Sequence, residues 1–298
     1  MTTKRIEKIL VPIALSREGT IAIDHAEMFC KVFDSKLIIM NIVPDDSLFR
    51  RIASGGNSNS VLEKAHQQLE KFVKKHFKGK IPDCINLQVR QGNLVPTIIQ
   101  ASKDFSSQLI IIKKSKRIIG KFAAFRKNNA DVLLGKSFCP VLTITENFTH
   151  DGIREIVMPV DITKKTDDKI RWAIYLAKNF NARVTVISVL DINIDARKSL
   201  TYKKALMIED QLTEEGIDCN VLLITETTGT QHEIFLRQLA KVKPDLIIIM
   251  THEESILSGD TIGKFAQEVI HEAKQPVFNV VPRIGSLFDI FDDDIKDL

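Results

Sequence analysis

Short apolar runs bounded by polar or turn-forming residues recur along this chain. The clearest is Leu246–Met250, which is followed by a polar loop and then by a helical pattern with apolar residues on one face. A run of this kind predicts a fully buried strand of a parallel sheet. A second apolar run, Val277–Val281, comes after the helical pattern. The order strand, loop, helix, strand predicts a βαβ unit.

The same order of patterns occurs twice, so the chain contains an internal repeat. The matched segments are residues 8–12 and 155–159, 34–37 and 181–184, and 108–112 and 245–249, with Gly92 opposite Gly229. The repeat predicts two similar domains, residues 1–148 and 149–283, followed by an acidic tail at 284–298. The tail is interpreted either as an amphipathic docking segment or as a frayed terminus.

Each copy alternates strand and helix patterns. In the first copy the predicted strands are 9–13, 37–43, 86–90, 109–112 and 141–144, and the predicted helices are 20–33, 61–76 and 97–104. Five strands alternating with helices predict an α/β fold, a doubly wound, Rossmann-like domain whose parallel sheet is covered on both faces. In such sheets, ligands bind at the carboxyl ends of the strands.

Composition and charge narrow the function classes. Hydrophobic residues make up 44% of the chain and charged residues 27%, and the net charge of +4 gives little support for nucleic-acid binding. No apolar run approaches the roughly 20 residues that a membrane-spanning helix needs. The four cysteines form no CxxC pair, and we expect reduced thiols in a cytoplasmic protein.

Four sequence features, present in order in both copies, resemble the universal stress protein family. They are an opening strand that ends in proline (KILVPIALS, EIVMPVDIT), the following helix and second strand, the glycine before the third helix, and a closing pattern clearest in LIIIMTHEE…IGKFAQEVIHEAKQPVFNVV. The resemblance covers nearly the whole chain. It implies a strand order of 3-2-1-4-5 in each domain. It also implies that the domains pair through their last strands, 141–144 against 277–280, as an intramolecular pseudo-dimer.

The nucleotide-binding branch of this family has a loop that reads glycine, two residues, glycine, nine residues, glycine and then Ser or Thr. Glycines let the backbone approach phosphates with N–H groups pointing inward. Placed on the second copy, the pattern falls on Met250, Glu253, Gly263 and Lys264, so only the third glycine is kept. Met250 would crowd the phosphate path. In the first copy we place the pattern on residues without any glycine, namely Lys114, Arg117, Lys127 and Asn128.

Four residues of the second copy are the candidates for a bound nucleotide. The resemblance places Asp161 beside the base and ribose, and Gly263 and Lys264 beside a phosphate, and Thr251 is a further candidate for cofactor binding. The alternatives are structural: a loop carboxylate that caps a helix at Asp161, and an ordinary helix start with a solvated lysine at 263–264.

Two further clusters carry weaker hypotheses. The first copy has a basic loop that could bind an anion or an RNA backbone, although such clusters are more often solvated: Lys113, Lys114, Lys116, Arg117, Lys121, Arg126 and Lys127. A zinc site is disfavoured because its would-be ligands match no compact motif: His252, Glu253, Glu254 and His271.

The leading prediction is a cytoplasmic stress-response binding or regulatory module that is not an enzyme and holds no cofactor or metal. Self-association through domain pairing, a homodimer of the whole chain and an unidentified protein partner are expected, without a membrane or nucleic acid. The alternatives are an ATP- or AMP-binding protein that uses the second copy, and an anion or RNA-backbone binder that uses the basic loop.

Overall fold

The structure is a computed structural model that describes residues 5–44, 58–114, 127–145, 152–160, 167–189, 195–226, 228–251 and 262–281. The first half contains β1 (Lys8–Pro12), α1 (Arg17–Phe33), β2 (Lys36–Val43), α3 (Ser58–His76), β3 (Ile85–Gln91), α4 (Leu94–Asp104), β4 (Leu109–Lys113), α5 (Lys127–Lys136) and β5 (Val141–Ile144). The second half contains β6 (Glu155–Pro159), α6 (Asp167–Phe180), β7 (Arg183–Val189), α7 (Asp195–Glu214), β8 (Cys219–Ile224), α8 (Gln231–Val242), β9 (Leu246–Met250), α9 (Lys264–Glu272) and β10 (Val277–Val280).

The predicted strands and helices of the first copy are confirmed, with small shifts at their ends. Helix α5 was not predicted, because its sequence KNNADVLLGK begins with polar residues and has only a short apolar stripe. The acidic tail lies outside the described residues, and the domain boundaries stay predictions. Among the helices described, none is long and apolar enough to cross a membrane.

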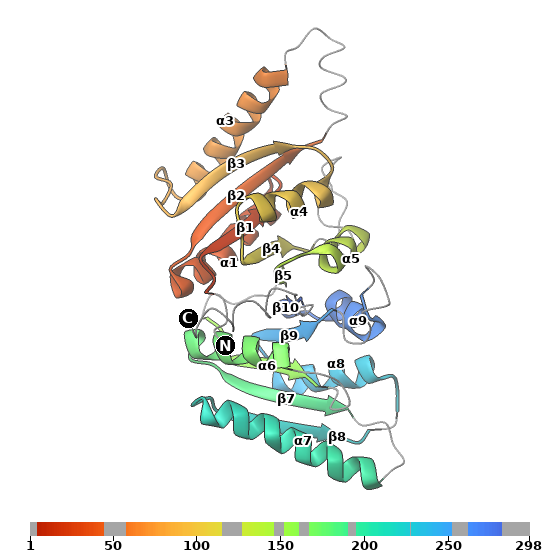
Figure 1. The fold of residues 1–298 in the computed structure, drawn as a ribbon. Helices are drawn as coiled ribbons and strands as arrows, with labels where there is room; N and C mark the ends of the chain where they lie inside the picture. The colour runs from red at the N-terminus through yellow and green to blue at the C-terminus, as the bar shows by residue number, and fades with distance from the viewer. Residues whose placement is uncertain are drawn as a thin grey trace, which may run out of the picture.

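All the strands join in one ten-stranded sheet of order β3-β2-β1-β4-β5-β10-β9-β6-β7-β8 (Figure 1). Each half therefore has the predicted order 3-2-1-4-5, with parallel pairing inside each half. The two halves meet where β5 and β10 run antiparallel, with Phe278 opposite Leu142 and Asn279 opposite Val141. The predicted pairing of the last strands is confirmed.

Helices cover both faces of this sheet, as a doubly wound topology requires. Residues of α1, α3, α6 and α7 share one hydrophobic cluster with one face of the strands. Residues of α4, α5, α8 and α9 share a second cluster on the opposite face. The strands next to the seam are buried along their whole length, which explains their continuous apolar runs.

The glycines that the repeat aligned have the same backbone role in both halves. Gly92 and Gly229 lie between the third strand and the next helix, with φ of 140° and 113°. A Cβ at Gly92 would lie 2.6 Å from the Thr97 hydroxyl, and one at Gly229 would lie 2.8 Å from the Glu233 carboxylate. Both positions therefore favour glycine for their conformation, and a larger residue would also have to displace these side-chain ends.

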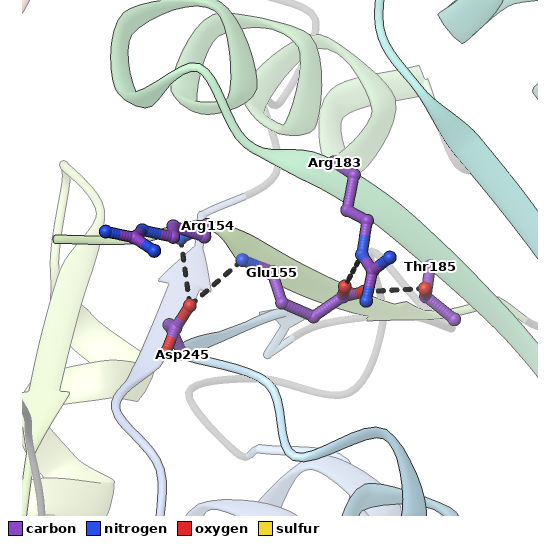
Figure 2. A network of polar contacts seen from close by, with 5 residues as sticks. All are labelled: Arg154, Glu155, Arg183, Thr185 and Asp245. Carbon is purple, nitrogen blue, oxygen red and sulfur yellow. Dashed lines mark hydrogen bonds and ion pairs between the residues drawn. The ribbon is translucent and has the colours of Figure 1, made fainter. Parts of the chain in front are cut away.

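The repeat also preserves a contact at the amino ends of the strands. Figure 2 shows the second half, where Asp245 accepts hydrogen bonds from the two N–H groups at the start of β6, at 2.8 and 3.0 Å. Gln108, its counterpart, accepts from two N–H groups at the start of β1, at 3.1 and 2.8 Å. The buried Glu155 carboxylate adds bonds from Thr185 and Arg183 (Figure 2). The Asp245 and Gln108 side chains thus pair with main-chain N–H groups at the starts of β6 and β1 that would otherwise be left unpaired when the sheet forms.

Aromatic side chains join the two halves on the face that α1 and α6 cover. Phe33 of α1 stacks on Tyr175 of α6, with ring centroids 5.4 Å apart and an interplanar angle of 8°. Phe29 and Phe180 make an edge contact at 5.2 Å. The Tyr175 hydroxyl accepts a hydrogen bond of 3.0 Å from the Ile6 N–H, and burial raises the pKa of this tyrosine. The contact combines apolar burial with a satisfied polar group.

We predict that Phe29→Ala lowers the free energy of unfolding by about 3–5 kcal/mol, because it opens a cavity in this contact. Phe29 is fully buried, and its loss removes contacts to both halves. Urea unfolding followed by fluorescence and by circular dichroism should show one transition at lower urea. Met207→Ala, at a side chain 60% exposed, is the control and should have little effect. Two separate transitions, with only the first domain's shifted, would contradict the prediction.

Candidate functional site

The glycine-containing loop of the nucleotide-binding branch begins at the carboxyl end of the fourth strand, which is β4 in the first half and β9 in the second. The strand register shows which residues of β4 and β9 correspond. Lys113 of β4 lies opposite Ile144 of β5, and Met250 of β9 lies opposite Val280 of β10. Lys113 is therefore the structural counterpart of Met250. The sequence-based placement of the first glycine position on Lys114 was wrong by one residue, since the repeat that matches 108–112 with 245–249 also aligns Lys113 with Met250. The conclusion that the first copy lacks this glycine is unchanged.

The two lysines that end β4 are bound to main-chain carbonyl groups. Lys113 is 7% exposed, and its ammonium donates to the Lys114 carbonyl oxygen at 2.9 Å. The Lys114 ammonium reaches the other half of the molecule and donates to the carbonyl oxygens of Ile270 and His271. These are carbonyls of the last turn of α9, which have no partner inside the helix and carry partial negative charge. Two positions of the predicted basic loop therefore have structural contacts; residues 115–126 lie outside the described part.

A polar cluster lies between α5 and α9, the helix whose last carbonyls bind Lys114. Asp131 of α5 accepts a hydrogen bond from the Gln267 side chain at 2.8 Å and lies 2.9 Å from His271 Nε2. The His271 side chain is 7% exposed and that of Asp131 is 17% exposed, so water screens their interaction poorly. The Thr145 hydroxyl bonds to the Lys274 carbonyl oxygen nearby. His271, a candidate zinc ligand from sequence, is thus part of the contact between the halves.

The second copy brings three of its four candidate residues together. Thr251 follows β9, and its carbonyl oxygen accepts the Gly263 N–H at 3.0 Å. The Thr251 hydroxyl is buried and has no hydrogen-bond partner among the described residues, which exclude 252–261. Gly263 is the N-cap of α9, with φ of −58° and no side-chain cap, and Lys264 begins the helix with an exposed side chain. Thr251, the N-terminus of α9 and Lys264 therefore form one end of the second domain.

Gly263 is not required by the backbone. Its φ is negative, and a Cβ there would make an ordinary contact of 3.8 Å with the Thr251 carbonyl oxygen. We expected Met250 to crowd the phosphate path. Its side chain instead packs in the hydrophobic cluster that α6 covers, and the residue is 6% exposed. Asp161, the fourth candidate, lies outside the described residues.

Lys169 is a charged residue near this end that sequence reasoning missed. It lies on α6, is 1% exposed, and donates to the Pro159 carbonyl oxygen at the end of β6 at 3.0 Å. A buried ammonium at the carboxyl end of a parallel strand is costly unless it is paired. In the sequence, only the apolar neighbours of Lys169 along the helix indicate that this lysine is buried.

Comparisons with known proteins agree with this architecture. The model of the universal stress protein family matches residues 5–145 and again residues 152–280. This chain belongs to the universal stress protein family. A comparison with curated protein sequences finds no match.

Solved structures show the same fold over almost the whole length. A universal stress protein from Archaeoglobus fulgidus is similar with a TM-score of 0.66 and 16% identity, over 95% of this chain and 98% of that one. A putative universal stress protein from Pseudomonas aeruginosa UCBPP-PA14 has a TM-score of 0.63 and 19% identity, over 93% and 94%. A functionally unknown protein from P. aeruginosa PAO1 has the same score and identity, over 93% of each chain.

This universal stress protein has two other features that resemble ligand sites. A groove of about 640 Å³ lies at the amino ends of β6 and β7, lined by Arg154, Arg183 and Asp218 among others. It is at the edge opposite to the one where doubly wound sheets bind ligands. His232 of α8 and Glu268 and Glu272 of α9 have ligand atoms within 4.8 Å of one another, which suits a divalent metal ion only loosely.

We predict that Lys114→Met weakens the contact between the halves of this universal stress protein. The methionine keeps the apolar stem but removes a charged donor from the last turn of α9, which should cost about 1.5–3 kcal/mol. Urea unfolding measures the loss, and hydrogen exchange should increase first in α9. Lys64→Met, at an exposed position of α3, is the matched control. Equal effects of the two substitutions would show that the Lys114 bonds contribute nothing.

Proposed function

We propose that this universal stress protein is a non-catalytic binding and regulatory module whose working unit is the pseudo-dimer. One observation carries the proposal. The end of β4, where a nucleotide-binding domain would start its glycine loop, carries Lys113 and Lys114, and both ammonium groups bind main-chain carbonyls. The first domain therefore uses this end to hold the molecule together.

The second domain supports the same proposal in part. Met250 fills the core at the position where the family pattern has its first glycine. Without that glycine the backbone cannot turn its N–H groups inward as freely at the end of β9. The protein would then act by binding a protein partner on the surface of the pseudo-dimer, without a nucleotide. Assembly of two whole chains into a homodimer stays a prediction, which light scattering of the purified protein would test.

Nucleotide binding by the second domain is the alternative function, and a specific observation favours it. Within the described part of the chain the buried Thr251 hydroxyl has no partner, and buried polar groups are normally satisfied. The Thr251 carbonyl bonds to Gly263 at the N-terminus of α9, where N–H groups and the helix dipole attract an anion. Gly263, which the backbone does not require, leaves space there for a phosphate. ATP or AMP is the ligand class that this arrangement suits.

We predict that the protein shows no saturable binding of ATP or AMP at millimolar concentration, with or without magnesium. Calorimetry and thermal shift are the measurements, because a ligand at one hundred times its dissociation constant would add roughly 2.7 kcal/mol of stability. A shift that Thr251→Val abolishes would overturn the proposal in favour of the second domain. Thr143→Val, at a buried hydroxyl bonded across the seam, is the matched control and should leave any binding unchanged.

A further inference from the structure

Two of the four cysteines lie against each other in the first domain, although 53 residues separate them in the sequence. Cys30 is in the last turn of α1, and Cys84 directly precedes β3. Their sulfur atoms are 3.7 Å apart, and both thiols are free. The contact follows from the topology, because β3 pairs with β2, and β2 begins directly after α1.

The two thiols have unequal environments. Cys84 is exposed, whereas Cys30 is 6% exposed and donates its S–H to the Ser35 carbonyl oxygen at 2.8 Å. Burial, followed by the neighbouring Cys84 thiol, raises the pKa of Cys30 to about 12. An oxidant in solution therefore reaches the exposed Cys84 sulfur before the buried Cys30 sulfur. Cys30 then supplies the second thiol.

Charged groups of both signs lie near the pair. The Lys31 ammonium interacts electrostatically with both thiols and pairs with the Glu27 carboxylate at 2.6 Å. Cys84 is exposed, whereas Cys139 is buried and Cys219 half-buried. Burial raises the pKa of the Cys139 thiol to about 12, and burial with nearby carboxylates raises that of Cys219 to about 12.

We propose that Cys30 and Cys84 form a reversible dithiol–disulfide site that responds to hydroperoxides. The Cys84 thiolate attacks one oxygen of the peroxide, the O–O bond breaks, and the products are a sulfenic acid on Cys84 and an alcohol or water. The Cys30 sulfur then attacks the Cys84 sulfur and displaces hydroxide, which leaves as water with the Cys30 proton. Two thiols lose two electrons and the peroxide gains them.

The disulfide would link the end of α1 to the start of β3. It would close a loop that contains β2 and α3, next to the edge strand of the sheet. A cross-link that restricts the unfolded chain raises stability. Oxidation would therefore stabilise the outer part of the first domain, while the seam and the carboxyl ends of the strands keep their contacts.

Oxidation of the native full-length chain by stoichiometric hydrogen peroxide tests this site. Titration of thiols after denaturation should fall from four to two per chain. The intact mass should fall by about 2 Da, for the two hydrogen atoms lost on forming one disulfide. Peptide mapping should find Cys30 joined to Cys84, and the melting temperature should rise until dithiothreitol reverses it. Four remaining thiols, or a disulfide that involves Cys139, would overturn the proposal.

Single substitutions distinguish the role of Cys84, which reacts with the peroxide, from that of Cys30, which completes the disulfide. Cys84→Ser should keep all its remaining thiols under the same peroxide, whereas Cys30→Ser should form a sulfenic acid that dimedone traps, without the loss of mass. Cys219→Ser is the matched control and should still lose two thiols. If Cys30→Ser fails to fold, wild-type protein treated briefly with N-ethylmaleimide replaces it: alkylation should reach Cys84 first and block the disulfide. A disulfide that still forms after Cys84 is alkylated, or an unchanged loss of two thiols in Cys84→Ser, would sink the idea.

Discussion

The antiparallel pairing of β5 with β10 is the contact on which the rest of the structure depends. Alone, each half would end in an apolar strand with a row of unpaired N–H and C=O groups, a surface prone to aggregation. The pairing removes both edges and buries both strands. The two buried polar side chains there, Thr143 and Asn279, donate across the seam to carbonyl oxygens at 3.3 and 2.9 Å. Their polarity is therefore compatible with a strand core.

The seam also determines which helices can touch. On one face it brings α1 against α6, where the rings of Phe29, Phe33, Tyr175 and Phe180 meet. On the other it brings α5 against α9, where the contacts are polar and include a histidine–aspartate pair. The first contact is mainly aromatic packing, whereas the second adds polar bonds in a poorly hydrated place to an apolar cluster that α5 and α9 share. The two faces of the pseudo-dimer are thus joined by different kinds of contact.

Much of the fold was predictable because its signals are local. Apolar runs, a glycine before the third helix and the repeat of both were enough for the strands, the helices and the two-domain division. The strand order and the pairing of the halves came from the resemblance to the universal stress protein family. Side-chain destinations were not predictable: nothing in the sequence links Lys114 to α9, Asp131 to His271, or Cys30 to Cys84. Those contacts exist only after the sheet has formed. The register at the end of β4, in contrast, was available from the sequence, because the matched runs 108–112 and 245–249 align Lys113 with Met250.

The two halves share a fold but use their strand ends differently, and α9 connects the two uses. Its N-terminus, at Gly263, donates to the Thr251 carbonyl oxygen of the second domain, and the carbonyls of its last turn bind the Lys114 ammonium of the first domain. The helix has only nine residues, so both ends belong to one short element. The two ends of α9 are therefore held by different halves of the molecule.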